Sequence, residues 1–452
     1  MTRLHPLPAV AQTCPQCRVP LTVRGWLIPG MRNLADLHCP RCARRFYGDL
    51  PAGQALFSPM LLEADTGKVH DPHGCEWFAR FLADSYAQRV NEPVSLRQEQ
   101  LRPLQHPVLL NCLDHLYGHS LLKLLNAQYY LDHRPDQDLV VLVPRFLRWL
   151  VPAGAAAIWT LDLPLRQGHT WNDWLAARLH ELIDPLPDAA LSLALSHPHP
   201  EEFDIARYSQ VVPFDVAQWQ PLLRQRPTVT FIWREDRVWD GAPDRLGTKL
   251  RRLGQRLGRR LRPAGTQDWR TQERLVTRVA EAMRRSFPKL DFALAGLGRP
   301  GRIPGWMTDL RQPQIDEAGE RAWCKRYARS HLVLGVHGSN MLLPSAHAGG
   351  VLELLPSDRW GNLIQDILPR AADARDALFR FRFLPLTSDT GAVVEAASTL
   401  LRQAASAALA FSRPWCDHAK VSADPTQPAR RRQEILCDLD AAPAPRSENA
   451  DA

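Results

Sequence analysis

Short apolar runs alternate with helical stretches over most of this chain, and that alternation limits the possible folds more than any other feature. The apolar runs lie at residues 138–144, 155–162, 229–233, 290–296, 331–336, 350–355 and 381–386, and the helical stretches include 171–184 and 271–286. Continuous apolar strands separated by helices are typical of parallel sheets covered on both faces. We therefore predict an α/β protein with two Rossmann-like domains, divided near residues 210–228.

The remaining segments complete a predicted domain plan for the 452 residues. Helical periods of apolar residues appear at 75–91 and 108–131, whereas 51–73 has the turn signals of an irregular linker. The last residues are rich in Pro, Ala and charge without an apolar period, which is typical of disorder. The plan has a cysteine-rich unit at 10–50, domains at 74–215 and 225–390, a helix at 391–415 that packs across the domains, and a disordered tail at 420–452.

Four cysteines form two CPxC pairs near the N-terminus: Cys14 with Cys17, and Cys39 with Cys42. Each pair places two sulfurs on one tight knuckle, and two knuckles complete the tetrahedral thiolate site that zinc prefers. Four protein ligands leave no open coordination position, so the predicted zinc is structural. The zinc ribbon would fold this unit or dock a partner, and its several arginines leave a nucleic-acid contact as a less favoured alternative.

The net charge of +8 and pI of about 9.2 favour an anionic partner, without choosing among nucleic acid, a membrane surface and a phosphate-bearing substrate. No apolar run reaches eighteen residues, and the N-terminus lacks the pattern of a secretory signal. The nine cysteines do not suggest a disulfide framework, so we expect a cytoplasmic protein. The basic stretch 245–262 has leucines at helical spacing; it suits either an anionic inner membrane face, an acidic acceptor or a solvated surface.

The segment HLVLGVHGSNMLLPSAHAGGVLELLP contains the most informative turn of the chain. A buried strand ends before His337 and Gly338, and Ser339 and Asn340 are good capping residues for a short helix. The start of a helix exposes backbone N–H groups that bind phosphate, and Gly338 allows close approach. Glu353 ends the next strand, where a carboxylate accepts hydrogen bonds from ribose hydroxyls. The alternative is a glycine turn with a buried histidine and no ligand.

Three blocks of sequence together resemble glycosyltransferase family 61. GVHGSNMLLP followed by GGVLELLP resembles the C-terminal signature of that family, VTFIWREDRVW resembles its strand with paired arginines, and DHLYGHSLLKLL resembles its N-terminal helix. The blocks occur in the family's order and cover residues 108–386. The resemblance implies a GT-B fold with two Rossmann-like domains facing a cleft, a nucleotide-sugar donor that is usually a UDP-sugar, and inversion at the anomeric carbon. Ser339, Lys123 and the zinc ribbon depart from the family pattern.

The resemblance also suggests roles for individual residues. Arg234 would hold the diphosphate together with the backbone around Gly338, and Arg237 would assist; a solvated surface pair is the alternative. No DxD-type motif follows a strand, so no catalytic metal is expected. The base that removes the acceptor proton would be His119, with Asp114 and His115 as further candidates. A plain structural histidine remains nearly as good an interpretation.

These observations favour an inverting glycosyltransferase that moves a sugar from a nucleotide sugar to a glycan or another hydroxyl acceptor. The alternative is a nucleic-acid-binding zinc-ribbon protein or a scaffold built on a degenerate glycosyltransferase fold. Nucleic acid is the less favoured partner, because charge alone supports it.

Overall fold

The computed structural model describes residues 1–5, 7–8, 10–164, 167–239, 241, 269–368 and 380–410. The chain divides into two compact units: unit 1 covers Met1–Phe203 and unit 2 begins at Asp204. The predicted domain boundary lay about ten residues later. Residues 204–214 belong to unit 2 because the Phe214 amide donates to the His347 carbonyl (2.7 Å) and the Phe214 ring packs in the core of that unit.

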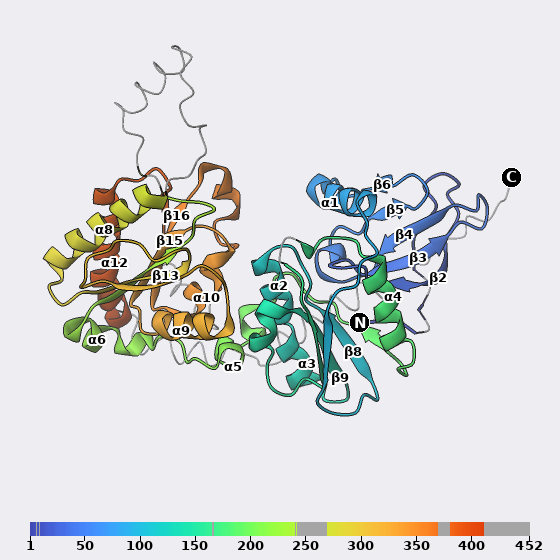
Figure 1. Ribbon diagram of the computed structural model, residues 1–452, viewed down its shortest axis with the longest axis horizontal. Coiled ribbons are helices and arrows are strands. Elements are labelled where there is room, and N and C mark those ends of the chain that lie inside the picture. The colour runs from blue at the N-terminus through green and yellow to red at the C-terminus, as the bar shows by residue number, and fades with distance from the viewer. Residues whose placement is uncertain are drawn as a thin grey trace, which may run out of the picture. The chain divides into compact units, whose positions relative to one another are not determined.

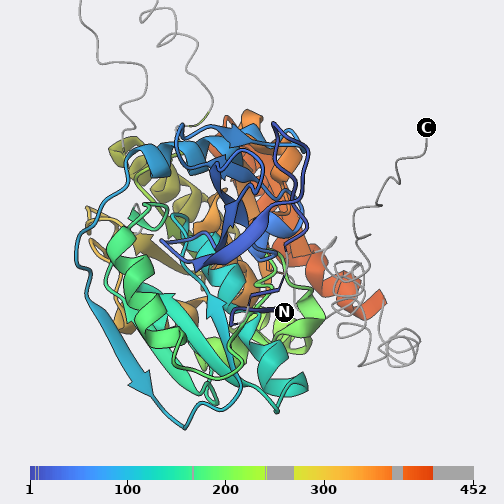
Figure 2. The same cartoon turned by 90° about the vertical axis from the view of Figure 1, so that its right-hand side faces the viewer.

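Unit 1 contains a mixed sheet of six strands in the order β1-β11-β8-β9-β10-β7. Its strands are β1 (Thr2–Arg3), β7 (Leu96–Gln100), β8 (Pro107–Asn111), β9 (Asp138–Pro144), β10 (Ala157–Leu161) and β11 (Ala190–Leu191). The four central strands are parallel, and the edge strands β1 and β7 are antiparallel to their neighbours. Figure 2 shows β7 at one edge of this sheet. The predicted Rossmann-like domain is therefore parallel at its centre and mixed at its edges.

A second sheet in unit 1 extends the cysteine-rich N-terminus much further than predicted. It is antiparallel and contains β2 (Thr22–Leu27), β3 (Leu34–His38), β4 (Arg45–Asp49), β5 (Leu61–Glu63) and β6 (Val69–His70). The prediction of an irregular linker at 51–73 was wrong, because β5 and β6 lie there. Short strands of two or three residues give too little periodicity to be read from sequence.

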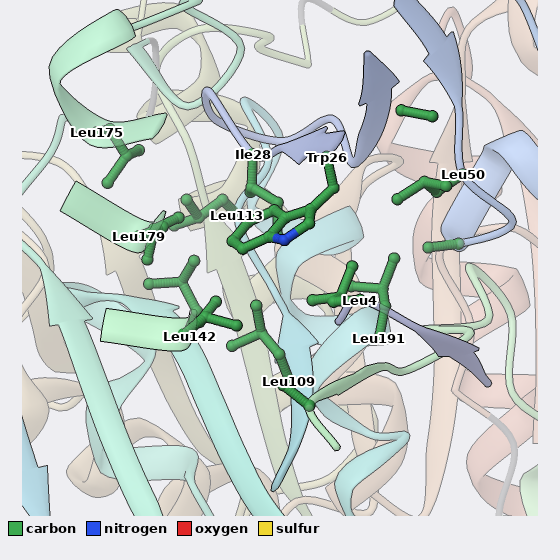
Figure 3. Close-up of a cluster of buried hydrophobic side chains, with 14 of the residues drawn as sticks. Leu4, Trp26, Ile28, Leu50, Leu109, Leu113, Leu142, Leu175, Leu179 and Leu191 are labelled. Atoms are coloured by element: carbon green, nitrogen blue, oxygen red, sulfur yellow. The ribbon is translucent and has the colours of Figure 1, made fainter. Parts of the chain in front are cut away.

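The two sheets of unit 1 share one hydrophobic core. Trp26 of β2 and Ile28, just after that strand, lie among Leu109, Leu113 and Leu142, as Figure 3 shows. Leu109 belongs to β8, Leu142 to β9, and Leu113 follows β8. Cys14 and Cys39 are fully buried in the same core. The cysteine-rich segment is therefore an integral part of unit 1, and the ribbon predicted at 10–50 is not a separate domain.

The helices of unit 1 are α1 (Glu76–Ala87), α2 (Tyr117–Leu124), α3 (Ala127–His133) and α4 (Asp173–Ile183). Helix α4 begins where the Asn172 side chain accepts a hydrogen bond from the Trp174 amide (3.0 Å), as N-cap asparagines do. The single helix predicted at 108–131 is wrong. Its first residues form the buried strand β8, and the rest is split into α2 and α3. An apolar run of this length is ambiguous between strand and helix, because both are buried on all sides.

Unit 2 is a fully parallel six-stranded sheet in the order β14-β13-β12-β15-β16-β17. The strands are β12 (Thr228–Trp233), β13 (Asp291–Leu297), β14 (Thr308–Gln312), β15 (Leu332–Val336), β16 (Gly350–Leu355) and β17 (Phe381–Pro385). Counted along the chain this is the order 3-2-1-4-5-6 of dinucleotide-binding folds, which confirms a Rossmann-like domain here. The order reverses between β12 and β15, and ligands of such sheets bind at the carboxyl ends of the strands at that point.

Helices pack on the sheet of unit 2 (Figure 1). They are α5 (Ile205–Ser209), α6 (Trp219–Gln225), α8 (Trp269–Ser286), α9 (Glu317–Tyr327), α10 (Leu342–His347) and α12 (Thr390–Ala410). Helix α8 buries Val276, Val279 and Met283, which recur at the spacing of one helical face. Helix α12 packs against α8, α6, β16 and β17 of its own unit, where the prediction was a helix packing across domains.

No helix among the described residues is long and apolar enough to span a membrane. The basic stretch 245–262, residues 411–415 of the predicted C-terminal helix and the predicted disordered tail at 420–452 lie outside the described residues.

Candidate functional site

Two arginines meet the turn after β15 at the point where the strand order of unit 2 reverses. Arg234 Nη1 donates hydrogen bonds to the His337 carbonyl (3.0 Å) and to Asn340 Oδ1 (2.7 Å). Arg237 Nη1 donates to the same carbonyl (2.8 Å). The sequence predicted this meeting of the paired arginines with the turn, although more than one hundred residues separate them.

Helix α8 holds the loop after β12 by hydrogen bonds, and this loop packs closely against the turn after β15. Gln272 is fully buried; its Nε2 donates to the Arg234 carbonyl (3.0 Å) and its Oε1 accepts from the Trp239 amide (2.8 Å). Gly338 has φ +149°, and a Cβ there would lie 1.9 Å from Arg234 Nη1. This φ favours glycine at the His337–Gly338 corner, and a side chain there would also displace the Arg234 guanidinium.

The turn after Gly338 differs from the predicted helix cap. It begins with a 3-10 turn, η6 (Ser339–Met341), before the six-residue helix α10, and no side chain caps either element. Ser339 is half-buried, and the Asn340 side chain is used by Arg234 instead. Within the described residues, the amides of Gly338, Ser339 and Asn340 donate no hydrogen bond, so three backbone donors remain at this corner.

His337 lies beneath the corner between two carboxyl groups. Its Nδ1 is 2.8 Å from Glu353 Oε2, and its Nε2 is 3.1 Å from Asp366 Oδ2. Glu353 is fully buried, so its carboxyl group contacts His337, whereas the sequence predicted a contact with ribose hydroxyls. Its other oxygen, Oε1, has no hydrogen-bond partner among the described residues.

The electrostatics of this trio favour a neutral histidine. Burial lowers the pKa of His337; Asp366 opposes this shift, while Arg237, Arg359 and Arg234 add to it. Burial, followed by the charge of Asp366, holds the pKa of Glu353 well above its usual range. With a neutral imidazole, a protonated Glu353 would donate to His337 Nδ1 and the Nε2–H group would donate to Asp366. The chain of hydrogen bonds orients the corner without placing a full charge on the imidazole.

The second cluster lies in unit 1, directly after β8. Asp114 is buried; its Oδ2 accepts from Lys123 Nζ (2.9 Å), and its Oδ1 lies 3.1 Å from His115 Nδ1 and 3.5 Å from His119 Nδ1. His115 Nδ1 is close to the carboxylate but lacks the alignment of a hydrogen bond. Burial alone raises the pKa of Asp114, but Lys123 and the two histidines hold it well below its usual range. The three predicted catalytic residues therefore share one site.

The sequence did not predict the role of Lys123 in the Asp114 cluster. It stands where the family pattern has an acidic residue, and its ammonium group donates to both Asp114 Oδ2 and the Leu113 carbonyl (2.8 Å). The lysine is 8% exposed, so it forms a buried ion pair. His119 is the more accessible of the two histidines, with 23% of its side chain exposed against 14% for His115.

The N-terminal sheet supports the loop that carries Asp114. Asn111 at the end of β8 is 1% exposed, and its Nδ2 donates to the Gly30 carbonyl and to Asn33 Oδ1, both at 3.0 Å. Its Oδ1 accepts from the Leu113 amide (3.0 Å). The loop between β2 and β3 thus reaches the residues next to Asp114 through one asparagine.

The four predicted zinc ligands lie together. The Sγ atoms of Cys14, Cys17, Cys39 and Cys42 are all within 4.8 Å of one another, and those of Cys14 and Cys42 are 3.8 Å apart. A tetrahedral zinc with Zn–S bonds of about 2.3 Å would place its sulfurs about 3.8 Å apart, so the geometry fits this metal. Within the described part of the chain, this is the one group of three or more His, Cys, Asp or Glu residues that could hold a metal ion.

Both cysteine pairs form the same knuckle. The Cys17 amide points to Cys14 Sγ (3.5 Å) and the Cys42 amide to Cys39 Sγ (3.4 Å). The residue after each pair, Arg18 or Ala43, has φ +59°. Two matching knuckles that bring their sulfurs together support a structural role for the metal.

Comparison with known proteins adds little to this geometry. No known family model and no curated protein matches the chain. Among solved structures, the ADP-heptose LPS heptosyltransferase II of E. coli is 11% identical over 66% of this chain and 99% of its own, with a TM-score of 0.33. A glycosyl transferase family 9 protein from Veillonella parvula is 11% identical over 68% of this chain and 100% of its own, with a TM-score of 0.35.

Both of these proteins are glycosyltransferases, but likenesses at such TM-scores and identities carry no inference about the family or activity of this chain. The resemblance to family 61 is not supported by any matching family model and rests on the three sequence blocks alone.

Proposed function

We propose that this protein is a glycosyltransferase whose unit 2 binds the nucleoside diphosphate part of a sugar donor. The observation that carries the proposal is the reversal of strand order between β12 and β15, with Arg234 and Arg237 converging on the turn after β15. Guanidinium groups and unused backbone amides at such a point are suited to bind phosphate oxygens. Asp236, which now holds Arg234 in a bidentate pair, is 73% exposed and can be displaced by a more highly charged anion.

The same strand order is found in dinucleotide-binding enzymes, but the turn after the first strand argues against that class. In those enzymes glycines in a G-x-G-x-x-G pattern let the pyrophosphate approach the backbone. Here β12 is followed by REDRVW, which brings charged side chains in place of glycines. A diphosphate that leaves during the reaction needs positive charge for stabilisation, and arginines supply it.

The three sequence blocks favour sugar transfer over the other reactions in which nucleoside diphosphates take part. Each block contains or closely follows the carboxyl end of a parallel strand: β8, β12 or β15. These are the positions at which α/β folds place ligand-binding residues. The donor would be a nucleotide sugar, by resemblance a UDP-sugar, and the acceptor a glycan or another hydroxyl compound.

In the proposed reaction His119 takes the proton of the acceptor hydroxyl, and the acceptor oxygen attacks the anomeric carbon. The bond from that carbon to the diphosphate breaks at the same time, which inverts the anomeric configuration, and Arg234 and Arg237 stabilise the departing diphosphate. Asp114 orients the imidazole and compensates the positive charge that it gains.

A binding screen tests the proposal. Titration of the full chain with UDP, GDP, ADP and CDP should raise its melting temperature for at least one of them, since a ligand at 100 times its Kd stabilises by about 2.7 kcal/mol. Arg234→Ala should weaken that binding, whereas Arg329→Ala should not. Arg329 is exposed and precedes β15, so it lies near the amino ends of the parallel strands, away from the carboxyl ends that form the proposed site. Absence of any nucleotide effect on wild-type protein would refute the donor site.

A further inference from the structure

We propose that Arg359 is a third guanidinium ligand of the diphosphate and that the loop after β16 forms a second wall of the site in unit 2. This inference rests on the proposed function and extends it to a residue that the sequence blocks did not single out. The loop comprises residues 356–368 and includes the 3-10 helix η7 (Ser357–Asn362).

The loop begins and ends beside the His337–Gly338 corner. Strands β15 and β16 are parallel neighbours with Val336 opposite Leu354, so the loop leaves the sheet at the edge where the corner lies. It returns to the same place because Asp366 Oδ2 lies 3.1 Å from His337 Nε2. Just beyond, the Leu368 amide donates to Ser345 Oγ of α10 (2.9 Å). Both anchors belong to the segment that carries the corner.

Arg359 lies on this loop with a guanidinium that the fold does not use. The backbone is held, since the Arg359 amide donates to the Pro356 carbonyl (3.0 Å). The side chain is 43% exposed, and its Nε donates no hydrogen bond to any described residue. The Nε atom is 3.5 Å from a carboxylate oxygen of Asp358, which is itself 75% exposed, and an exposed pair of this kind contributes little.

The positive charge of Arg359 lowers the pKa of Arg237 and of His337, as the charge of Arg234 does. Burial lowers the pKa of Arg237, and the charges of Arg234 and Arg359 lower it further. The pKa of His337 is lowered by the same three arginines. Arg237 donates to a carbonyl group rather than to a carboxylate, and the charges of Asp236 and Asp358 oppose the lowering of its pKa only in part. A polyphosphate would supply the balancing charge.

The arrangement matches a diphosphate better than a single phosphate. Arg234 and Arg237 come from the loop after β12 and reach the corner from one side, while Arg359 comes from the loop after β16. One phosphate group can be bound bidentately by one or two guanidinium groups. A second phosphate group gives the third guanidinium a partner, so we infer that Arg359 makes the site selective for diphosphates.

The test is a titration of the full chain with inorganic pyrophosphate and, separately, with inorganic phosphate, followed by isothermal calorimetry. Wild-type protein should bind pyrophosphate at least about tenfold more tightly than phosphate. Arg359→Ala should weaken pyrophosphate binding by roughly tenfold to a hundredfold and leave phosphate binding within about threefold, because a charge-assisted bidentate contact is lost. Melting temperatures of both proteins should agree, since the Arg359 side chain is half-buried and its Nε donates no hydrogen bond to any described residue.

Arg329→Ala is the matched control, because it removes an exposed arginine near the amino ends of the same parallel strands. An equal loss in both variants would mean that only net charge matters and would overturn the inference. It is also overturned if Arg359→Ala binds pyrophosphate as wild type does while Arg234→Ala loses binding, a result that leaves the proposed function standing. Wild-type protein that binds neither pyrophosphate nor any nucleoside diphosphate would end both proposals.

Discussion

Each of the two α/β units places a histidine–carboxylate cluster directly after a parallel strand, and the two clusters have opposite compositions. In unit 1 one buried carboxylate, Asp114, lies near two histidines and is neutralised by Lys123. In unit 2 one buried histidine, His337, lies between two carboxyl groups. The pKa of Asp114 is held well below its usual range, whereas that of Glu353 is held well above it.

Because of this difference, the Asp114 cluster can exchange protons with a ligand, whereas the His337 cluster holds the turn after β15. His119 keeps 23% of its side chain exposed, so a ligand can reach its imidazole while Asp114 stays ionised behind it. His337 is only 2% exposed, and both of its ring nitrogens have carboxyl partners. Similar residue types therefore suit a base in unit 1 and a support for the phosphate-binding corner in unit 2.

Removal of zinc should have the largest effect and should affect one cluster only. The Asn111 side chain connects the N-terminal sheet to the loop of Asp114, so loss of the metal should loosen β8 and α2. Structural zinc sites contribute on the order of 10 kcal/mol to folding. After treatment with a strong chelator, or in Cys14→Ser, hydrogen exchange should rise over residues 107–124 and stay unchanged in β12 and β15.

Cys75→Ala is the matched control for this experiment, because Cys75 lies outside the zinc site. It should keep one zinc per chain by mass spectrometry of the metal and wild-type exchange rates. Protection of residues 107–124 that survives complete removal of zinc would show that the N-terminal sheet holds this loop without the metal.

The next largest effect is expected for Asp114→Asn. The change leaves the Lys123 ammonium buried beside a neutral amide, and removal of one partner from a buried ion pair costs about 3–5 kcal/mol. The double variant Asp114→Asn, Lys123→Met should recover part of the loss, because no unpaired charge remains. Unfolding in urea, followed by hydrogen exchange in β8, measures both. A single variant as stable as wild type would contradict the buried pair.

His119→Ala should leave stability nearly unchanged and lower turnover. Loss of a general base reduces kcat by about 10²–10⁴, and the partly exposed side chain contributes little to the core. The measurement is the rate of sugar transfer from a nucleotide sugar that carries the nucleoside diphosphate found by the binding screen, with the donor saturating for both proteins. His133→Ala on α3, an exposed histidine, is the control. If His119→Ala turns over as fast as wild type, the base lies elsewhere.

Sequence patterns predicted the parallel core of unit 2 and the meeting of Arg234 with the His337–Gly338 turn. These predictions succeeded because buried parallel strands are continuous apolar runs, and because their carboxyl ends lie at one edge of the sheet. The convergence of the four cysteines was predicted for a similar reason, since the CPxC spacing itself fixes the geometry of each knuckle.

Long-range packing accounts for what the sequence did not reveal. Strand β8 was taken for helix because both forms bury all of its side chains, and β5 and β6 were too short to show a period. Asp366 and Arg359 belong to no motif, and Lys123 departs from the pattern of the block in which it lies. Each gains its role from a partner brought near by folding, and their one common signal is that they follow strands β8 and β16 at the carboxyl edge of a sheet.

The smallest expected effect separates the two clusters most directly, because it applies to unit 2 the same acid-to-amide change that is costly in unit 1. If Glu353 is protonated, Glu353→Gln replaces one donor to His337 Nδ1 by another of the same shape. Near pH 4, where this carboxyl group is also largely protonated in the unfolded chain, the variant should therefore differ from wild type by less than about 1 kcal/mol, against about 3–5 kcal/mol at neutral pH for Asp114→Asn. Glu353→Ala, which leaves His337 Nδ1 unpaired, should be clearly destabilised.

The pH dependence of the two amide variants should also have opposite signs. The folded pKa of Glu353 lies above its unfolded value of about 4.3, so its contribution to stability is complete below that pH and falls as pH rises toward the folded pKa. Asp114 has a lowered folded pKa, so its contribution is complete above about pH 4 and is lost as pH falls. From pH 4 to pH 8, Glu353→Gln should thus gain stability relative to wild type in urea unfolding. A relative loss over that range would mean that Glu353 is ionised beside a charged His337.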